Sequence, residues 1–131
     1  MIAPNMSTML GFIFTNANIS SDTLQKLIIS SNEISFNSIT VDSDTSTSDT
    51  LLLAATKTAK HKPINNFKDT RLIEFKKNLF SLMLELAKLI IKDGEGASKF
   101  ITIKVTGAKS KKSAKIIAVS YTHLTLPTIA I

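Results

Sequence analysis

Ser7 and Thr8 are the first residues whose types and position could do chemistry, because this hydroxyl pair directly precedes the apolar run MLGFIFTNA. A threonine hydroxyl is a weak nucleophile at neutral pH unless a base lies beside it. If the peptide bond between Ser7 and Thr8 were cut, Thr8 would gain an α-amino group with an unperturbed pKa of about 7.7–8.0. Nucleophile and base would then belong to one residue. The two residues alone favour a simpler interpretation, a helix cap or a loop.

Glu95 is the second candidate, in the run DGEGASK, where a glycine stands on each side of the acid. Glycine tolerates unusual backbone angles, so the chain could bring this carboxylate close to the amino group of a ligand. By itself the pattern favours a solvated acid in the loop that ends a helix. A phosphate-binding loop is excluded, because the glycine spacing is wrong and a strand is predicted to follow.

The run DSDTSTSDTLLL places Asp42, Asp44 and Ser46 like the first ligands of a calcium-binding loop. That motif needs glycine at its sixth position and glutamate at its twelfth, where this chain has Thr47 and Leu53. The calcium motif therefore fails, and we expect no metal site. The sequence predicts instead a structural loop whose carboxylate and hydroxyl side chains accept hydrogen bonds from backbone amides.

The composition narrows the classes of function. The chain has 131 residues, 44% of them hydrophobic and 20% charged, an ordinary balance for one globular domain. Its net charge of +6 comes from lysines, with Arg71 the only arginine, one tyrosine and no tryptophan, which argues against a nucleic-acid partner. The absence of cysteine excludes a disulfide framework and a cysteine nucleophile, and it fits a reducing compartment. His61, between two lysines, is expected to be solvated.

No membrane or export signal is visible. The first residues lack the positive and apolar regions of a signal peptide. The longest apolar stretch, NLFSLMLELAKLII, is interrupted by Glu85 and Lys88 and is shorter than the ~20 residues that span a bilayer. We therefore expect a cytoplasmic protein without a membrane partner.

The elements that would position these residues can be predicted from periodicity. MLGFIFTNA predicts a buried strand, and the next segment predicts a helix capped by Ser21 or Asp22. SITVD and LLLAAT predict two short strands. The apolar face of this first helix is expected at Leu24, Leu27, Ile28 and Ile34.

The strongest predicted element is a second helix, capped by Asp69 or Thr70 and ended by Gly94. Its narrow polar stripe predicts that other layers cover it on most sides. KFITIKVTG alternates like a strand, and SKKSAKIIA begins a third helix. This order predicts a layered α/β (or α+β) domain. The stripe consists of Lys77, Ser81, Glu85, Lys88 and Lys92.

Three separated runs resemble one known family. MIAPNMSTML is similar to the processing site of the ornithine acetyltransferase / glutamate N-acetyltransferase family of arginine biosynthesis, whose precursor cuts itself before the threonine. SFNSITVDSDTSTSDT and DGEGASKFITIKVTGA resemble two further motifs of that family, in the family's order. The chain departs from the family at Ser7, Ser43 and Ser48, which replace alanine, glycine and asparagine. The resemblance covers about residues 1–118.

The resemblance implies a ping-pong reaction at Thr8, after self-cleavage between Ser7 and Thr8. Thr8 would take the acetyl group from N-acetylornithine as an ester, release ornithine and pass the acetyl group to glutamate. Glu95 matches the family's substrate-binding glutamate, and Thr8 is the other substrate-contacting residue in this chain. No cofactor is implied, although the bifunctional members also accept acetyl groups from acetyl-CoA.

The resemblance also implies a partial αββα sandwich of the N-terminal-nucleophile type. In the family an α and a β subunit build this sandwich and assemble as a heterotetramer of two α and two β chains. This chain would be the first part of the β subunit, with Met1 an internal methionine. The missing α subunit would hold a substrate-contacting lysine and the Thr-Gly pair that stabilises the oxyanion. We therefore expect this fragment to be inactive alone.

Residues 119–131 break the pattern. VSYTHLTLPT resembles the translation of a sequencing adapter, so we expect one partial β-subunit domain over residues 1–118 and a non-native tail over residues 119–131. A genuine C-terminal strand is the alternative. His123 lies in this tail and is given no chemical role.

Two other functions stay open at this point. An N-terminal-nucleophile amidohydrolase or aminopeptidase would use water in place of glutamate as the acyl acceptor, and would release acetate without glutamate. A non-catalytic small α/β module would leave the Ser7–Thr8 bond intact and carry no acyl group.

Overall fold

A small parallel sheet forms the frame of the fold. The computed structural model describes residues 9–40, 48–94 and 98–125, with side chains up to residue 121. Its elements are β1 (Leu10–Thr15), α1 (Ser21–Asn32), the 3₁₀ turn η1 (Phe36–Ser38), β2 (Thr50–Ala55), α2 (Leu72–Lys92) and α3 (Lys111–Thr125). The strands β1 and β2 run parallel, in register from Leu10 opposite Thr50 to Thr15 opposite Ala55. Parallel neighbours need a crossover, and α1 lies in that connection.

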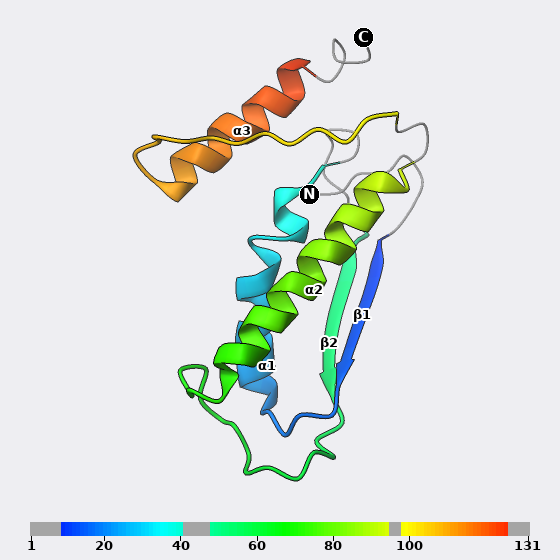
Figure 1. Cartoon of the computed structure of the whole chain (residues 1–131), viewed down its shortest axis with the longest axis vertical. Helices are drawn as coiled ribbons and strands as arrows, with labels where there is room; N and C mark the ends of the chain where they lie inside the picture. The colour runs from blue at the N-terminus through cyan, green and yellow to red at the C-terminus, as the bar shows by residue number, and fades with distance from the viewer. Residues whose placement is uncertain (1–8, 41–47, 95–97, 126–131) are drawn as a thin grey trace.

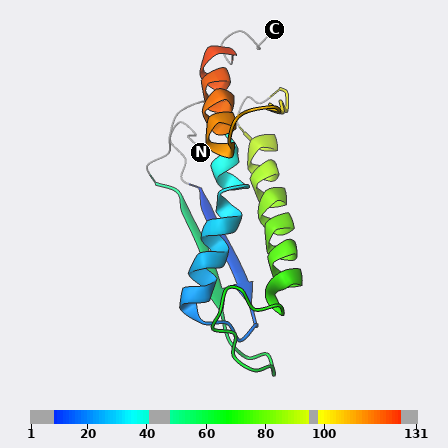
Figure 2. The same cartoon turned by 90° about the vertical axis from the view of Figure 1, so that its left-hand side faces the viewer.

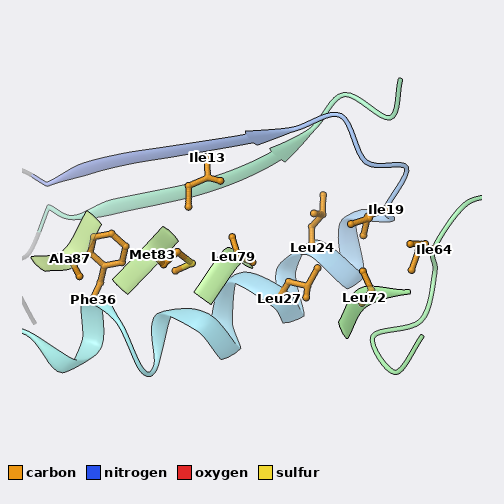
Figure 3. Close-up of a cluster of buried hydrophobic side chains, with 10 residues drawn as sticks. All are labelled: Ile13, Ile19, Leu24, Leu27, Phe36, Ile64, Leu72, Leu79, Met83 and Ala87. Carbon is orange, nitrogen blue, oxygen red and sulfur yellow. The ribbon is translucent and has the colours of Figure 1, made fainter. Parts of the chain in front are cut away.

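Two helices pack on one face of this sheet. Figures 1 and 2 show α1 and α2 side by side, with both strands on the same side of them. The core lies between these layers, and Figure 3 shows its side chains converging from β1, from the helices and from the connecting segments. The buried apolar residues are Ile13, Ile19, Leu24, Leu27, Phe36, Ile64, Leu72, Leu79, Met83 and Ala87.

The first helix forms where it was predicted, with two corrections. Its N-cap is Ser20, whose hydroxyl accepts a hydrogen bond from the Thr23 amide at 3.4 Å, rather than Ser21 or Asp22. Leu24 and Leu27 are buried and Ile28 is half-buried against the core, as expected. Ile34 is exposed, because the helix ends at Asn32 and the chain turns away before it.

The second helix is the long element that was predicted, and all five residues of its polar stripe are exposed. It begins at Leu72, with Arg71 at the N-cap position and no side-chain cap there. Asp69 instead accepts a hydrogen bond from the Arg71 amide at 2.9 Å. The expected cover on most sides was wrong for the part of the chain that the structure describes, because Ile73, Leu82 and Leu89 are exposed.

Two predicted strands are absent from the residues that the structure describes. In SITVD, Ser38 ends η1, Ile39 and Thr40 are irregular, and the remaining residues lie outside the described part of the chain. KFITIKVTG forms no strand over residues 99–107, although Ile103 and Val105 are half-buried and their polar neighbours exposed. A strand needs a partner for its backbone groups, and alternation alone does not supply one.

The third predicted helix forms as α3, and the Ser110 hydroxyl accepts a hydrogen bond from the Ser113 amide at 3.1 Å near its start. In Figure 1 it lies at one end of the molecule, apart from the α1 and α2 layer. The helix continues from Lys111 to Thr125, across the predicted boundary at residues 118 and 119. Among the described residues, no helix is long and apolar enough to cross a membrane.

Candidate active site

The residues predicted to do chemistry lie outside the described part of the chain. Ser7 and Thr8 precede it, Glu95 falls in the undescribed residues 95–97, and most of the DSDTSTSDT loop falls in residues 41–47. The structure does describe the segments to which these residues are joined: Met9 after Thr8, and Gly94 before Glu95. The positions of Met9 and Gly94 show to which end of the fold Thr8 and Glu95 are joined.

The topology brings these two segments to the same end of the fold. In Figures 1 and 2 the start of β1, the start of β2 and the end of α2 lie at one end of the layers. The reason is the direction of the chain, since α2 runs opposite to the two parallel strands. Residue 8 leads into β1 and residue 95 follows α2, so both candidate residues are joined to that end.

Met9 is held through its backbone and its side chain. Its amide donates a hydrogen bond to Asp49 Oδ1 at 3.2 Å, and its carbonyl accepts one from the Thr50 amide at 2.8 Å. Its side chain is half-buried against the core. Asp49 belongs to the DSDTSTSDT run, so the prediction that this loop bonds backbone amides through its carboxylates is confirmed at this residue.

The two strands approach closely just beyond this point. A Cβ atom placed on Gly11 would lie 2.8 Å from Leu51 Cδ1 on the neighbouring strand, nearer than atoms of this kind pack. Glycine leaves room for the Leu51 side chain at the second rung of the ladder, where Gly11 and Leu51 are opposite each other. The start of β1 is therefore closely packed against β2.

A shallow apolar hollow lies at the last turn of α2, at the same end of the fold as the start of β1. Its lining residues are Leu89, Ile90, Lys92 and Asp93, directly before Gly94. Among the described residues, no group of three or more His, Cys, Asp or Glu side chains is arranged to hold a metal ion.

The opposite end of the layers is closed by charge and by hydrogen bonds. Arg71 pairs with Asp69 at 2.7 Å, and its guanidinium donates to the carbonyls of Lys62 at 3.0 Å and Pro63 at 3.4 Å. The side-chain hydrogen bond from Arg71 holds the pKa of Asp69 below its ordinary value of 3.8, and the same bond raises the pKa of Arg71. This pair fastens the connector between β2 and α2 and lies away from the candidate site.

His61 is part of this closure, so the expectation that it is merely solvated was wrong. The backbone amide of Asn18 donates a hydrogen bond to His61 Nε2 at 2.9 Å, and His61 Nδ1 lies 2.9 Å from the Lys62 carbonyl oxygen. A carbonyl accepts only, so the two contacts together assign the tautomer with the proton on Nδ1. The half-buried ring joins the β1–α1 turn to the connector. No local sequence signal indicated this role, because the Asn18 partner is 43 residues away.

A parallel β–α–β unit with helices packed on one face defines a layered α/β protein. The sequence model of the ArgJ family matches residues 1–131. The chain therefore belongs to the ArgJ family.

Individual relatives agree with this assignment. The chain is 49% identical over 134 aligned residues to the arginine biosynthesis bifunctional protein ArgJ of Brucella suis biovar 1, covering 100% of this chain and 32% of that protein. It is 48% identical over 120 residues to the protein of the same name from Zymomonas mobilis, covering 92% of this chain and 29% of that one.

A solved structure shows the same fold. The crystal structure of the arginine biosynthesis bifunctional protein argJ from Bacillus halodurans matches with a TM-score of 0.65 and 38% identity, over 70% of this chain and 42% of that chain. The expected α/β fold of the N-terminal-nucleophile type is confirmed by this likeness. The chain spans about a third of the length of the curated relatives it matches.

Proposed function

We propose that the protein to which this chain belongs is an ornithine acetyltransferase / glutamate N-acetyltransferase of arginine biosynthesis, with Thr8 as its nucleophile. The membership in the ArgJ family carries this proposal. The relatives bear the name of a bifunctional protein of arginine biosynthesis, which agrees with it. The fold adds support, because it leads the segments next to Thr8 and Glu95 to one end of the layers.

The nucleophile is prepared by self-cleavage. Thr8 Oγ attacks the carbonyl carbon of Ser7, the peptide C–N bond breaks as the Thr8 nitrogen takes the hydroxyl proton, and water hydrolyses the resulting ester. The products are a carboxylate on Ser7 and a free α-amino group on Thr8. This amine then serves as the base for the adjacent hydroxyl.

The transfer takes place in two halves. Thr8 Oγ attacks the acetyl carbon of N-acetylornithine, the amide C–N bond breaks, and ornithine leaves with the proton that the Thr8 amine had accepted. The amino group of glutamate then attacks the acetyl ester, which releases N-acetylglutamate and restores the Thr8 hydroxyl. Glu95 is proposed to bind a charged amino group of the substrate through its carboxylate. Acetyl-CoA is a further acetyl donor if the protein is bifunctional.

The outer face of the sheet supports the proposal that more protein covers it. Its side chains are apolar and exposed, although a parallel sheet is ordinarily covered on both faces. We propose that the α subunit and the rest of the β subunit form the second half of an αββα sandwich, within a heterotetramer of two α and two β chains in the cytoplasm. The fragment alone is then inactive. The exposed residues are Leu10, Phe12, Phe14 and Leu52.

Intact-protein mass spectrometry tests this function. The chain is joined to the preceding and following segments of the Brucella suis relative, and compared with the same protein carrying Thr8→Ala. We expect a break between Ser7 and Thr8, followed by an adduct of ~42 Da on the new Thr8 terminus after N-acetylornithine is added. Thr8→Ala is expected to stay whole and unmodified.

The other outcomes are equally informative. Acetate released at a rate independent of glutamate would assign an amidohydrolase in place of the transferase. A folded, uncut and unmodified protein would rule out the Thr8 mechanism and favour a non-catalytic module.

A further inference from the structure

We propose that Asp49 is a positioning residue for the Thr8 nucleophile, because its carboxylate holds the amide of Met9. This inference rests on the proposed function of Thr8. The DSDTSTSDT run thereby gains a specific role, since one of its carboxylates reaches across 40 residues of sequence to the residue next to the nucleophile.

The contact extends the sheet by one rung toward Thr8. The parallel ladder begins where Leu10 lies opposite Thr50. One residue earlier, the Thr50 amide still reaches the Met9 carbonyl at 2.8 Å, and the Asp49 carboxylate accepts from the Met9 amide at 3.2 Å. Asp49 and Thr50 together satisfy both backbone groups of Met9.

The rest of Met9 is fixed by packing. Its side chain is half-buried against the core, and the tight passage of β1 along β2 at Gly11 follows two residues later. Met9 is therefore a fixed point at the start of the strand. Removal of the Asp49 carboxylate would free the amide of Met9, while the carbonyl and the side chain of Met9 stay held.

The amide of Met9 is the nitrogen of the peptide bond that joins Thr8 to the chain. A peptide group is planar, so a bond to its N–H restricts the orientation of the whole group. Both proposed steps need the Thr8 hydroxyl to reach a carbonyl carbon in a defined direction, first in Ser7 and then in the acetyl donor. A displacement of about 1 Å at such a centre can cost about 100-fold in rate.

The experiment uses the full-length protein rebuilt with the segments of the Brucella suis relative. Asp49→Ala removes the acceptor, and Asp49→Asn keeps an oxygen acceptor of the same length without the charge. Asp22→Ala is the matched control, because Asp22 is an exposed carboxylate bound to Lys26 at 2.6 Å on α1. The measurements are the rate of cleavage by intact mass, kcat and KM for N-acetylornithine, and Tm.

We expect Asp49→Ala to slow both self-cleavage and kcat by ~10–100-fold while KM changes little. Asp49→Asn is expected to restore both rates to within ~3-fold of the wild type, because it retains the hydrogen-bond geometry. Asp22→Ala is expected to match the wild type in both rates. The split between kcat and KM separates positioning from substrate binding.

Three results would overturn the inference. Wild-type rates in Asp49→Ala would show that the contact is not needed, with the Thr8 mechanism intact. Equal losses in Asp49→Asn and Asp49→Ala would assign the effect to charge rather than to position. An uncut, unacylated wild-type protein would reject the Thr8 mechanism and this inference with it. If Asp49→Ala has a lowered Tm, the rates of Asp49→Asn decide.

Discussion

The two faces of the β1–β2 sheet have similar side chains and opposite environments. On the inner face, Ile13 is 7% exposed and packs with α1 and α2, whereas on the outer face Phe14, its neighbour in sequence, is 70% exposed. A half-buried strand normally alternates apolar with polar residues, and LGFIFT does not. The difference teaches that β1 has the sequence of a strand in a sheet covered on both faces. The described residues cover only one of these faces.

The largest expected effect is at Phe14 on the outer face, where one substitution should have different consequences in the isolated chain and in the full-length protein. Phe14→Ala is expected to change the free energy of unfolding of the 131-residue chain by less than about 0.5 kcal/mol, because the ring is exposed there. In the rebuilt full-length protein the same change is expected to cost about 3–5 kcal/mol, because a second layer would bury the ring. Urea denaturation of both proteins measures the difference. A small effect in both would show that the outer face stays uncovered.

The inner face provides the matched comparison. Met83 on α2 is fully buried in the core, so Met83→Ala is expected to lower the free energy of unfolding by about 2–5 kcal/mol. Unlike the change at Phe14, this loss should appear in the isolated chain as well as in the full-length protein. Urea midpoints of the two proteins check it. A loss found only in the full-length protein would contradict the core in Figure 3.

The hydrogen bonds of His61, at the end of the layers opposite the candidate site, allow the cost of a lost hydrogen bond to be compared with the cost of lost packing. His61→Ala removes the acceptor of the Asn18 amide and is expected to cost about 1–2 kcal/mol. Nitrogen NMR should show the His61 ring with its proton on Nδ1, and His123→Gln identifies the signal by removing the other imidazole. A proton on Nε2 in the native chain would contradict the assigned contacts.

The smallest expected effect is a pH dependence at Asp69. Its pKa is lowered in the folded chain by the hydrogen bond from Arg71, so its contribution to stability is present above the unfolded value near 3.8. That contribution is lost as the pH falls through the lower folded value. Tm curves of the wild type and Asp69→Asn should therefore separate above pH 4 and converge in strong acid. Parallel curves throughout would exclude the pair as the cause.

Local pattern predicted the elements that are stabilised within one segment or by burial along it. The sequence showed the period of α2 and the buried face of α1 with Leu24 and Leu27. It also showed the apolar strands β1 and β2. The patterns failed where a partner is needed. KFITIKVTG alternates, but a strand forms only when another strand accepts its backbone hydrogen bonds. The cover expected over Leu82 and Leu89 is likewise not provided by the described residues.

The candidate site divides in the same way. The types and order of the residues near Thr8 and Glu95 indicated the family, and the whole-chain match confirmed that family. Two hydrogen bonds, from Met9 to Asp49 and from Asn18 to His61, join residues that are 40 and 43 positions apart. No local pattern in the sequence predicts them.

The sequence by itself determined the family, the helices and the apolar strands, because these follow from residue types and from short-range periodicity. The tertiary structure alone decided which strands pair, which face of the sheet is covered, and that the segments next to Thr8 and Glu95 lead to one end of the fold. The physical reason is that α2 returns antiparallel to the sheet and that backbone groups and apolar faces find their partners only when distant segments pack together.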